Sequence, residues 1–338
     1  MINTLIIDDS PLARDFIRDF LGGDESFKII GEAEDGEEGL QKILSMNPDL
    51  VTIDIDMPKM NGLEVIKEVM KTTSVPIVVI SSNDTAKNAY EATLLGALEF
   101  YSKSTFSGYI SPQKQHEIYE TLKRISGIKA NKNKADAVSI QPFAQLDKRE
   151  IRMVVIASST GGPKALSHFF TLLPGDFPVP IAIVQHNSSG FDESFAQWLN
   201  DFTPLKVKIA EEKEVPCKGT VYIAKTDKHL LVQKKDNDFC LCYNDDEPEN
   251  NQKPAADILF RTAAQSLGSS VISVVLTGMG NDGAAGTKKI KEMGGITLAQ
   301  DEKSSLIYSM PKSAVETGCV DIELPLDLIP EELVKLTK

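Results

Sequence analysis

Short apolar runs and longer segments of helical periodicity alternate through the first 125 residues of the chain. The apolar runs predict five strands, and the periodic segments predict five helices. We expect the strands at Thr4–Asp8, Phe27–Ala33, Leu50–Asp54, Ile77–Ser81 and Leu98–Ser102, and the helices at Leu12–Leu21, Glu37–Met46, Leu63–Lys71, Thr85–Leu95 and Gln113–Ile125. This alternation predicts a doubly wound parallel sheet, in which ligands bind at the carboxyl ends of the strands.

The second half of the chain repeats the alternation with more strongly apolar runs. Buried strands are expected at VVIA (154–157), IAIVQH (181–186), VISVV (271–275) and ITLAQ (296–300), and helices at Lys164–Leu172, Phe195–Leu199 and Ala256–Leu267. The shorter runs between Lys206 and Asn244 favour antiparallel strands at an edge or in a flap. The fold class is therefore α/β, with two doubly wound parallel-sheet domains.

The two halves are separated by a stretch of low apolar content at 126–149. It carries Lys129, Lys132 and Lys134 with no acidic residue among them, which is typical of a tether. A chain of 338 residues is long enough for two cores. We expect a first domain at 1–125, a linker at 126–149 and a second domain at 150–338.

The net charge is −13, and it is shared by both halves. Residues 1–150 contain 17 basic and 24 acidic residues, and the remainder contains 19 and 25. Neither half is basic, which argues against nucleic acid or an anionic membrane as the main partner. No apolar run approaches the ~18 residues of a spanning helix, and the first ten residues do not resemble a signal peptide. A cytoplasmic protein is expected.

Four cysteines fit that compartment as buried, reduced thiols: Cys217, Cys240, Cys242 and Cys319. Cys240 and Cys242 are expected on one face of a strand. A zinc site needs further ligands at suitable spacing, which the sequence does not offer.

Polar residues follow the predicted strands of the first domain. Asp8 and Asp9 follow the first strand, and Asp54, Ser81 and Lys103 end the third, fourth and fifth. Carboxylates that converge at one sheet edge repel one another unless a cation lies among them, and oxygen ligands favour Mg²⁺. Asp54 can then accept a phosphoryl group, whose charge the metal, Lys103 and the Ser81 hydroxyl neutralise.

These residues stand in segments that strongly resemble a two-component receiver domain: LIIDDS, DLVTIDIDMPKMNG, VVISS and FYSKS. The resemblance implies a flavodoxin-like fold and phosphorylation of Asp54 by a histidine kinase. It places Asp8, Asp9 and the Asp56 carbonyl at the metal and Phe100 at the family's switch position. The family usually has a proline where this chain has Ser104.

In the second domain, the strand-to-helix corner at Ser159 has the pattern A-x-S-x-G. A hydroxyl there points to solvent beside the free N–H groups of the next helix, where an oxyanion can be stabilised. An ordinary βα loop is the alternative. Ser158 is a rival nucleophile, but strand alternation directs it elsewhere, and Gly161 two residues beyond Ser159 favours Ser159.

His186 and Asp282 also lie beyond the carboxyl ends of predicted parallel strands. His186 can therefore act as the base for Ser159, and Asp282 can fix its tautomer. The other histidines, His116, His168 and His229, are expected to be structural. The turn GMGNDG, with Asp301 after the next strand, also fits a dinucleotide site, although Asp282 would place a carboxylate in its phosphate loop.

The segments SSTGG, QHNSSGF and LTGMGNDGAAG resemble the catalytic domain of the chemotaxis methylesterases, the CheB family. The resemblance implies hydrolysis of glutamyl methyl esters on chemoreceptors and deamidation of receptor glutamines, with no cofactor for this reaction. It places Ser159, His186 and Asp282 in the triad, and Thr160 and Met279 at the oxyanion and substrate. Departures from the family pattern are Ala157, Ser158, Asn187 and Ser188.

The same resemblance implies that the receiver covers the catalytic cleft until Asp54 is phosphorylated. The expected partners are methyl-accepting chemoreceptors and a chemotaxis histidine kinase, and the chain is expected to be a monomer. Two other classes stay open at this point. A receiver fused to an inactive binding module would show no acyl-enzyme, and a transcriptional regulator would need a basic helix-turn-helix.

Overall fold

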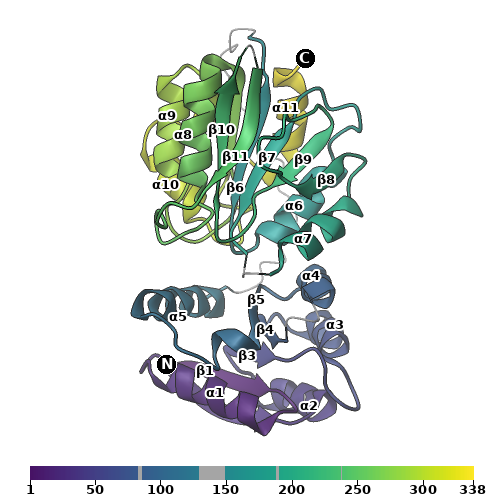
Figure 1. The fold of residues 1–338 in the computed structure, drawn as a ribbon. Coiled ribbons are helices and arrows are strands. Elements are labelled where there is room, and N and C mark those ends of the chain that lie inside the picture. Colours follow the sequence, from purple (N-terminus) through teal and green to yellow (C-terminus); the bar gives the residue numbers. More distant parts are fainter. Residues whose placement is uncertain (83–85, 129–148, 188–189, 237) are drawn as a thin grey trace. The chain divides into compact units, whose positions relative to one another are not determined.

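The computed structural model describes residues 1–82, 86–128, 149–187, 190–236 and 238–338. The chain divides into two compact units, Met1–Ser139 and Ile140–Lys338. The division falls inside residues 129–148, which lie outside the described residues and include most of the predicted tether. Ser188, where the chain departs from the family pattern, also lies outside the described residues. Figure 1 labels the elements of both units.

The first unit contains a five-stranded parallel sheet in the order β2-β1-β3-β4-β5. Its strands are β1 (Ile2–Ile7), β2 (Phe27–Ala33), β3 (Leu50–Ile53), β4 (Ile77–Ser81) and β5 (Glu99–Ser102). Its helices are α1 (Pro11–Gly22), α2 (Gly36–Met46), α3 (Gly62–Thr72), α4 (Ala86–Leu95) and α5 (Pro112–Ser126), with a 3₁₀ turn at Lys103–Thr105. The predicted doubly wound sheet is confirmed.

Polar side chains begin α1, α2, α3 and α5, because the first N–H groups of a helix have no partner within it. At α1 the Ser10 hydroxyl accepts from Ala13 N, and Pro11 lies in the first turn. At α2 the Asp35 carboxylate accepts from Glu38 N. Asn61 begins α3 with a reciprocal capping box. At α5 the Ser111 hydroxyl accepts from Lys114 N. The caps at Ser10 and Asn61 begin α1 and α3 directly after the loops that carry Asp8 and Asp54.

The second unit contains a seven-stranded parallel sheet in the order β14-β13-β12-β6-β7-β9-β8 and a separate β10–β11 pair. Its strands are β6 (Met153–Ser158), β7 (Ile181–Gln185), β8 (Lys206–Ile209), β9 (Thr220–Ile223), β10 (His229–Lys235), β11 (Asp238–Asn244), β12 (Val271–Val275), β13 (Ile296–Gln300) and β14 (Ile322–Leu324). Its helices are α6 (Gly162–Thr171), α7 (Asp192–Asn200), α8 (Ala256–Leu267), α9 (Ala284–Glu292), α10 (Met310–Glu316) and α11 (Ile329–Leu336).

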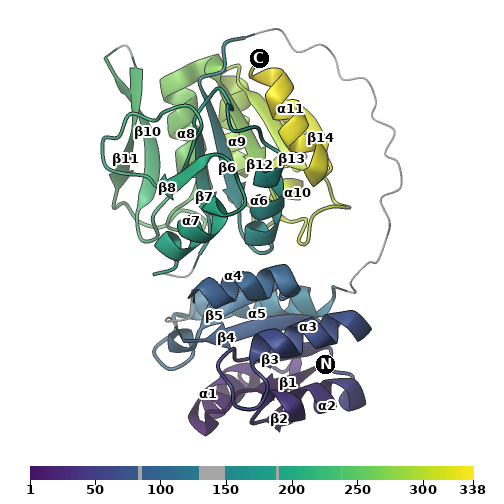
Figure 2. The same cartoon turned by 90° about the vertical axis from the view of Figure 1, so that its right-hand side faces the viewer.

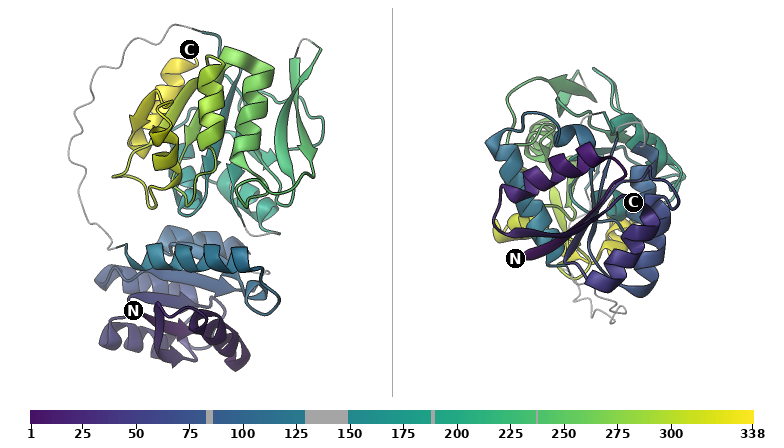
Figure 3. Two further views of the ribbon diagram at one scale, coloured as in Figure 1. Left: turned by 90° about the vertical axis from the view of Figure 1, so that its left-hand side faces the viewer. Right: turned by 90° about the horizontal axis from the view of Figure 1, so that it is seen from below.

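Helices α8, α9 and α10 lie on one face of this sheet, and α6, α7 and α11 lie on the other (Figure 1). The antiparallel β10–β11 hairpin packs beside α8 (Figures 2 and 3). Its attachment includes a hydrogen bond from Val232 N to the Thr262 hydroxyl, 3.1 Å long. The second predicted α/β domain is thus confirmed, including its small antiparallel part.

The prediction of antiparallel strands was wrong for β8 and β9, which pair in parallel with each other, and β9 pairs in parallel with β7. Residues 210–219 return the chain from the end of β8 to the start of β9, so no hairpin forms. Periodicity indicates which side chains of a strand are buried and not the direction in which the strand pairs. Cys217 lies in this return and is exposed, and Cys319 is half-buried, so the predicted burial holds only for Cys240 and Cys242.

The core of the second unit forms where α8 and the hairpin pack on the sheet. One apolar cluster there includes side chains that are at most 1% exposed: Phe260, Leu230, Leu241 and Tyr222.

Among the described residues, no helix has the length and apolar character that a membrane-spanning helix requires.

We predict that Phe260→Ala lowers the unfolding free energy of the second unit by ~3–5 kcal/mol, because it leaves a cavity under α8. Trp198 is the only tryptophan of the chain and is 4% exposed, so its fluorescence in a urea titration reports this unit. Leu172→Ala, at a 45% exposed position, is the control and should change the midpoint little. An equal loss in both variants would contradict this account of the core.

Candidate active site

Three loops of the second unit meet where its strand order reverses. Strand β6 lies between β12 and β7 in the sheet, so the loops that follow these three strands share one edge. Ser159 follows β6, His186 follows β7, and Asp282 lies seven residues beyond β12. This is the position at which doubly wound sheets bind their ligands.

The two serines at the end of β6 have different surroundings. Ser158 is completely buried, and its hydroxyl donates to Gln185 Oε1 over 2.7 Å. Ser159 is half-buried, and its backbone is held from both sides: its N–H donates to Thr277 O, and its carbonyl accepts from Gly162 N. The Ser158 hydroxyl is therefore engaged within the protein, whereas Ser159 lies at the surface of the site.

His186 and Asp282 form a direct pair, with 2.9 Å between His186 Nε2 and Asp282 Oδ2. Facing an ionised carboxylate, Nε2 carries the proton and donates it to the hydrogen bond. His186 Nδ1 is buried and has no hydrogen-bond partner among the described residues. A neutral imidazole in this tautomer keeps its lone pair on Nδ1, where it can accept a proton.

Asp282 is 2% exposed, and five N–H groups donate to its carboxylate. Besides His186 Nε2 they are Ala256 N at 2.6 Å, Asp257 N at 3.0 Å, Gly283 N at 3.1 Å and Asn250 Nδ2 at 3.2 Å. Burial acts to raise the pKa of Asp282, but the hydrogen bond from His186 and those from the N–H groups of α8 outweigh it, and the pKa lies below its ordinary value. Asp282 is therefore ionised.

A second buried carboxyl group, which the sequence did not reveal, lies beside Asp282. Asn250 Nδ2 donates to Asp257 Oδ2 over 2.8 Å as well as to Asp282, and Asp257 also accepts from Gly286 N. Burial and the charge of Asp282 raise the pKa of Asp257 above its ordinary value. Asn250 stands in a loop without regular periodicity, so no sequence signal identified it.

The loop after β12 is held against Ser159. Gly278 N donates to Ile307 O, Met310 N donates to Gly278 O, and the Thr277 hydroxyl donates to Thr160 O over 3.1 Å. A Cβ atom at Gly278 would lie 2.8 Å from Ser159 Cβ, so only glycine permits this approach. Met279 follows and is half-buried, while Thr160 is buried.

The remaining histidines lie in other surroundings. His229 is fully buried between Glu247 O and Ala255 N, which occupy both of its ring nitrogens. His168 is exposed and pairs with Asp327, and His116 is exposed on α5.

The carboxylates of the first unit also meet at one edge. One ligand oxygen from each of Asp8, Asp9 and Asp54 lies within 4.8 Å of the others. Lys103 Nζ donates to Asp54 Oδ2 over 2.6 Å and to Asp8 Oδ1 over 3.0 Å, and the Ser81 hydroxyl donates to Asp54 Oδ1 over 2.6 Å. Burial acts to lower the pKa of Lys103, but the two carboxylates outweigh it and raise that pKa.

The Asp8 carboxylate has one oxygen that could ligate a cation. Its Oδ2 is buried and accepts no hydrogen bond of good geometry among the described residues, although Lys103 Nζ lies 2.9 Å away. Burial, assisted by the charge of Asp54, raises the pKa of Asp8 despite the donors Lys103 and Ser10 N. A divalent cation among three carboxylates would relieve this unfavourable burial.

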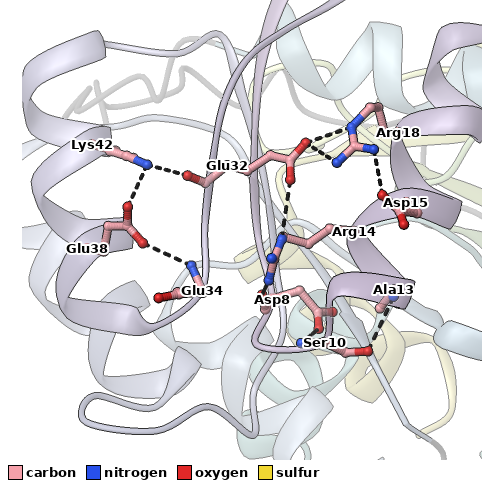
Figure 4. A network of polar contacts seen from close by, with 10 residues as sticks. All are labelled: Asp8, Ser10, Ala13, Arg14, Asp15, Arg18, Glu32, Glu34, Glu38 and Lys42. Atoms are coloured by element: carbon pink, nitrogen blue, oxygen red, sulfur yellow. Dashed lines mark hydrogen bonds and ion pairs between the residues drawn. The ribbon is translucent and has the colours of Figure 1, made fainter.

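The loop that carries Asp8 is fixed from behind by a network of ion pairs (Figure 4). Arg14 donates to Asp8 O over 2.7 Å and to Glu32 on β2, and Glu32 also pairs with Arg18. These contacts set the backbone at the end of β1, and the Asp8 side chain is left to face Lys103.

Three other predicted positions of the first unit lie in different settings. Asp56 is exposed on the turn after β3, and Phe100 is half-buried against the core of its unit. Ser104, in place of a proline, lies in the 3₁₀ turn after β5, and its N–H donates to the Ser102 hydroxyl over 3.3 Å.

Comparison with known proteins accounts for nearly the whole chain. The family model for the CheB methylesterase matches residues 154–333, and that for the response regulator receiver domain matches residues 4–108. The chain is 37% identical to a protein-glutamate methylesterase/protein-glutamine glutaminase of Pyrococcus horikoshii, over 99% of this chain and 93% of that protein. The identity is also 37% to the protein of the same name from Clostridium acetobutylicum, over 100% and 98%.

The chain belongs to the CheB methylesterase family. Among solved structures, the CheB methylesterase catalytic domain of Thermotoga maritima is similar, with a TM-score of 0.54 and 40% identity over 56% of this chain and all of that domain. Membership of the CheB family agrees with the glycine-rich turn at Gly278 being part of a hydrolase site, and it replaces the dinucleotide-binding alternative.

We predict that Asp282→Asn destabilises the second unit of this CheB chain by ~1–3 kcal/mol at pH 7, because the amide would place an NH₂ group against N–H donors. Urea titration followed by Trp198 fluorescence measures the loss, and Asp301→Asn, in a loop after β13, is the control.

The difference should depend on pH in one direction. A depressed pKa gives stability that is present above the unfolded value near 3.8 and lost as the pH falls through the lower folded value. The gap between wild type and Asp282→Asn should thus be constant from about pH 5 to 8 and shrink in stronger acid. A gap that widens in acid would contradict an ionised Asp282.

Proposed function

We propose that the chain is a phosphorylation-activated serine hydrolase whose catalytic triad is Ser159, His186 and Asp282. It converts glutamyl methyl esters of chemoreceptors and water to glutamate and methanol, and it deamidates receptor glutamines. The observation that carries the residue assignment is the His186–Asp282 pair, which leaves a buried Nδ1 without a partner among the described residues, at the sheet edge that also carries Ser159. This reaction uses no cofactor.

In the acylation step, Ser159 Oγ attacks the ester carbonyl carbon while its proton passes to His186 Nδ1. Asp282 stabilises the imidazolium through Nε2. As the tetrahedral intermediate collapses, the C–O bond to the methoxy group breaks, and Nδ1 returns the proton to give methanol. Water then attacks the acyl-enzyme by the same route and releases the glutamate side chain and free Ser159.

The negative charge of the tetrahedral intermediate needs fixed donors. We assign the backbone N–H groups of Thr160 and Met279 to this role, because Thr160 follows the nucleophile and the Met279 loop is held against Ser159 through Gly278. One such donor is typically worth ~3 kcal/mol in the transition state. For a receptor glutamine, the same steps release ammonia in place of methanol.

Ser159→Ala should abolish release of methanol from methylated receptor, because the hydroxyl supplies the nucleophile. It should leave folding intact, because Ser159 is half-buried and its hydroxyl makes no hydrogen bond among the described residues. Ser167→Ala on α6 is the matched control. Its side chain is 3% exposed, donates only to Lys164 O among the described residues, and should be dispensable. A Ser159→Ala protein that hydrolyses ester near the wild-type rate would remove Ser159 from the mechanism.

The first unit is proposed as the phosphoacceptor domain, with Asp54 taking the phosphoryl group from a chemotaxis histidine kinase. Asp8, Asp9, Asp54 and the Asp56 carbonyl would hold Mg²⁺, which neutralises charge on the transferred group. This donor set is supported by Asp8 Oδ2, which is buried, accepts no hydrogen bond among the described residues and lies in the cluster with Asp9 and Asp54. Lys103 and Ser81 already contact Asp54 and would bind phosphoryl oxygens, while Phe100 would respond to them.

The proposed boundaries remain 1–125 for the receiver domain, 126–149 for the linker and 150–338 for the esterase domain. The match to the receiver family supports control of the esterase by phosphorylation. A cytoplasmic location and action as a monomer are proposed with it.

A small-molecule phosphodonor with Mg²⁺ should raise the methylesterase rate of the full chain, and Asp54→Asn should lose this increase but keep the basal rate. EDTA should have the same selective effect. Asp56→Asn is the matched control, because it retains the backbone carbonyl and should still be activated. Loss of the basal rate in EDTA would place a metal in the ester reaction, and activation of Asp54→Asn would identify another acceptor.

A further inference from the structure

Gln185 lies between the loop of the nucleophile and the loop of the base. It ends β7, is 3% exposed and directly precedes His186. Its Nε2 donates to Ser159 O over 3.1 Å and to His186 O over 3.0 Å, and its Oε1 accepts from the Ser158 hydroxyl over 2.7 Å. One carboxamide thus joins the backbone of both residues that must exchange a proton.

These bonds continue the strand pairing where the sheet ends. The β6–β7 register finishes at Ser158 opposite Gln185, and the last backbone bond runs from His186 N to Ser158 O over 3.0 Å. Beyond it the two chains separate into loops. The Gln185 side chain is the next link between them, and it acts at the residues whose relative position decides proton transfer.

The amide orientation follows from its neighbours. Two carbonyl oxygens select the NH₂ group, and the Ser158 hydroxyl selects the oxygen; the reverse orientation would set oxygen against two carbonyls. The Gln185 carboxamide packs against Gly162, where a Cβ atom would overlap Gln185 Oε1. Glycine at this position therefore leaves the space that the carboxamide occupies. All three bonds are buried or half-buried, so water replaces them poorly.

We infer that Gln185 is a positioning residue for the hydrolysis, holding Ser159 and His186 at the separation that proton transfer requires, with Ser158 fixing its orientation. This inference rests on the proposed function. Gln185 acts through the two backbone carbonyls rather than on the substrate. A misplacement of about 1 Å costs roughly 100-fold in rate, so its loss should appear in kcat and not in KM.

The test compares Gln185→Met with Thr297→Val in the full chain. Thr297 is an equally buried residue whose hydroxyl bonds with Cys319 O, Asp321 Oδ2 and Asp321 N, so its loss also removes three hydrogen bonds. Methanol release from methylated receptor gives kcat and KM, and Trp198 fluorescence gives the folded fraction. We expect kcat to fall about 100-fold in Gln185→Met and less than about threefold in Thr297→Val, with both KM values within about threefold of wild type.

Gln185→Glu keeps the size of the side chain and adds a second readout. When ionised, the introduced carboxylate would accept from Ser158 but repel both carbonyls; when protonated, it would regain one donor. The titratable groups nearby are His186 and Asp282, so each rate is divided by the wild-type rate at the same pH. This ratio should rise as the pH is lowered from about 8 to about 6, and it carries the test if Gln185→Met folds poorly.

Two results would overturn the inference: equal kcat in Gln185→Met and Thr297→Val at equal folded fraction, or a Gln185→Glu ratio that does not change with pH. Reaction of Ser159 with a fluorophosphonate probe separates this failure from that of the proposed function. If Ser159→Ala is inactive and unlabelled while Gln185→Met labels and turns over normally, the triad stands and the positioning role is wrong. If Ser159→Ala still hydrolyses ester, the triad itself fails.

Discussion

Five N–H groups converge on the buried carboxylate of Asp282, and the proposed catalytic triad of the second unit depends on them. An ionised carboxylate without such donors would protonate in this apolar setting. Two of the donors are the first N–H groups of α8, which have no partner within the helix and carry its positive end. Because Asp282 stays ionised, the His186 proton is fixed on Nε2, and the lone pair on Nδ1 is left for Ser159.

In the first unit, the buried carboxylates at the sheet edge have too few donors and cations to satisfy them. Lys103 faces two buried carboxylates, Asp8 and Asp54, while Asp9 adds a third negative charge nearby. One ammonium group cannot neutralise three carboxylates, so this edge favours a divalent cation and, with it, the charged phosphoryl group. At the edge of the second sheet, the Asp282 carboxylate instead accepts from five protein N–H groups, and the neighbouring Asp257 accepts from Asn250 and Gly286. Both sheets are parallel and doubly wound, and the donors that face the buried carboxylates distinguish the two edges.

Alternation of strands and helices was sufficient to predict both sheets, and the ends of those strands marked Ser159, His186, Asp54 and Lys103. The sequence pattern did not identify the residues whose side chains hydrogen-bond to backbone or carboxylate groups of the site. In the sequence, Gln185 is a polar residue at the end of a predicted strand, and Asn250 lies in a loop without periodicity. Their roles depend on which carbonyl or carboxylate the fold brings opposite them. The direction of β9 was mispredicted for a related reason, since periodicity reports which face is buried and not which neighbour is paired.

Control of the esterase by the receiver requires little free energy. A 100-fold activation corresponds to ~2.7 kcal/mol, because each tenfold change in rate is worth about 1.4 kcal/mol. Phosphorylation of Asp54 replaces a carboxylate of charge −1 by an acyl phosphate of about −1.5 to −2, so it adds up to about one negative charge and three strong acceptors. One or two charge-assisted hydrogen bonds to these acceptors supply about 2.7 kcal/mol. The five donors to Asp282 all come from the second unit, so the proposed triad can form within that unit alone. Under the proposed function, phosphorylation changes how often the site is available to substrate, and the second unit carries out the chemistry.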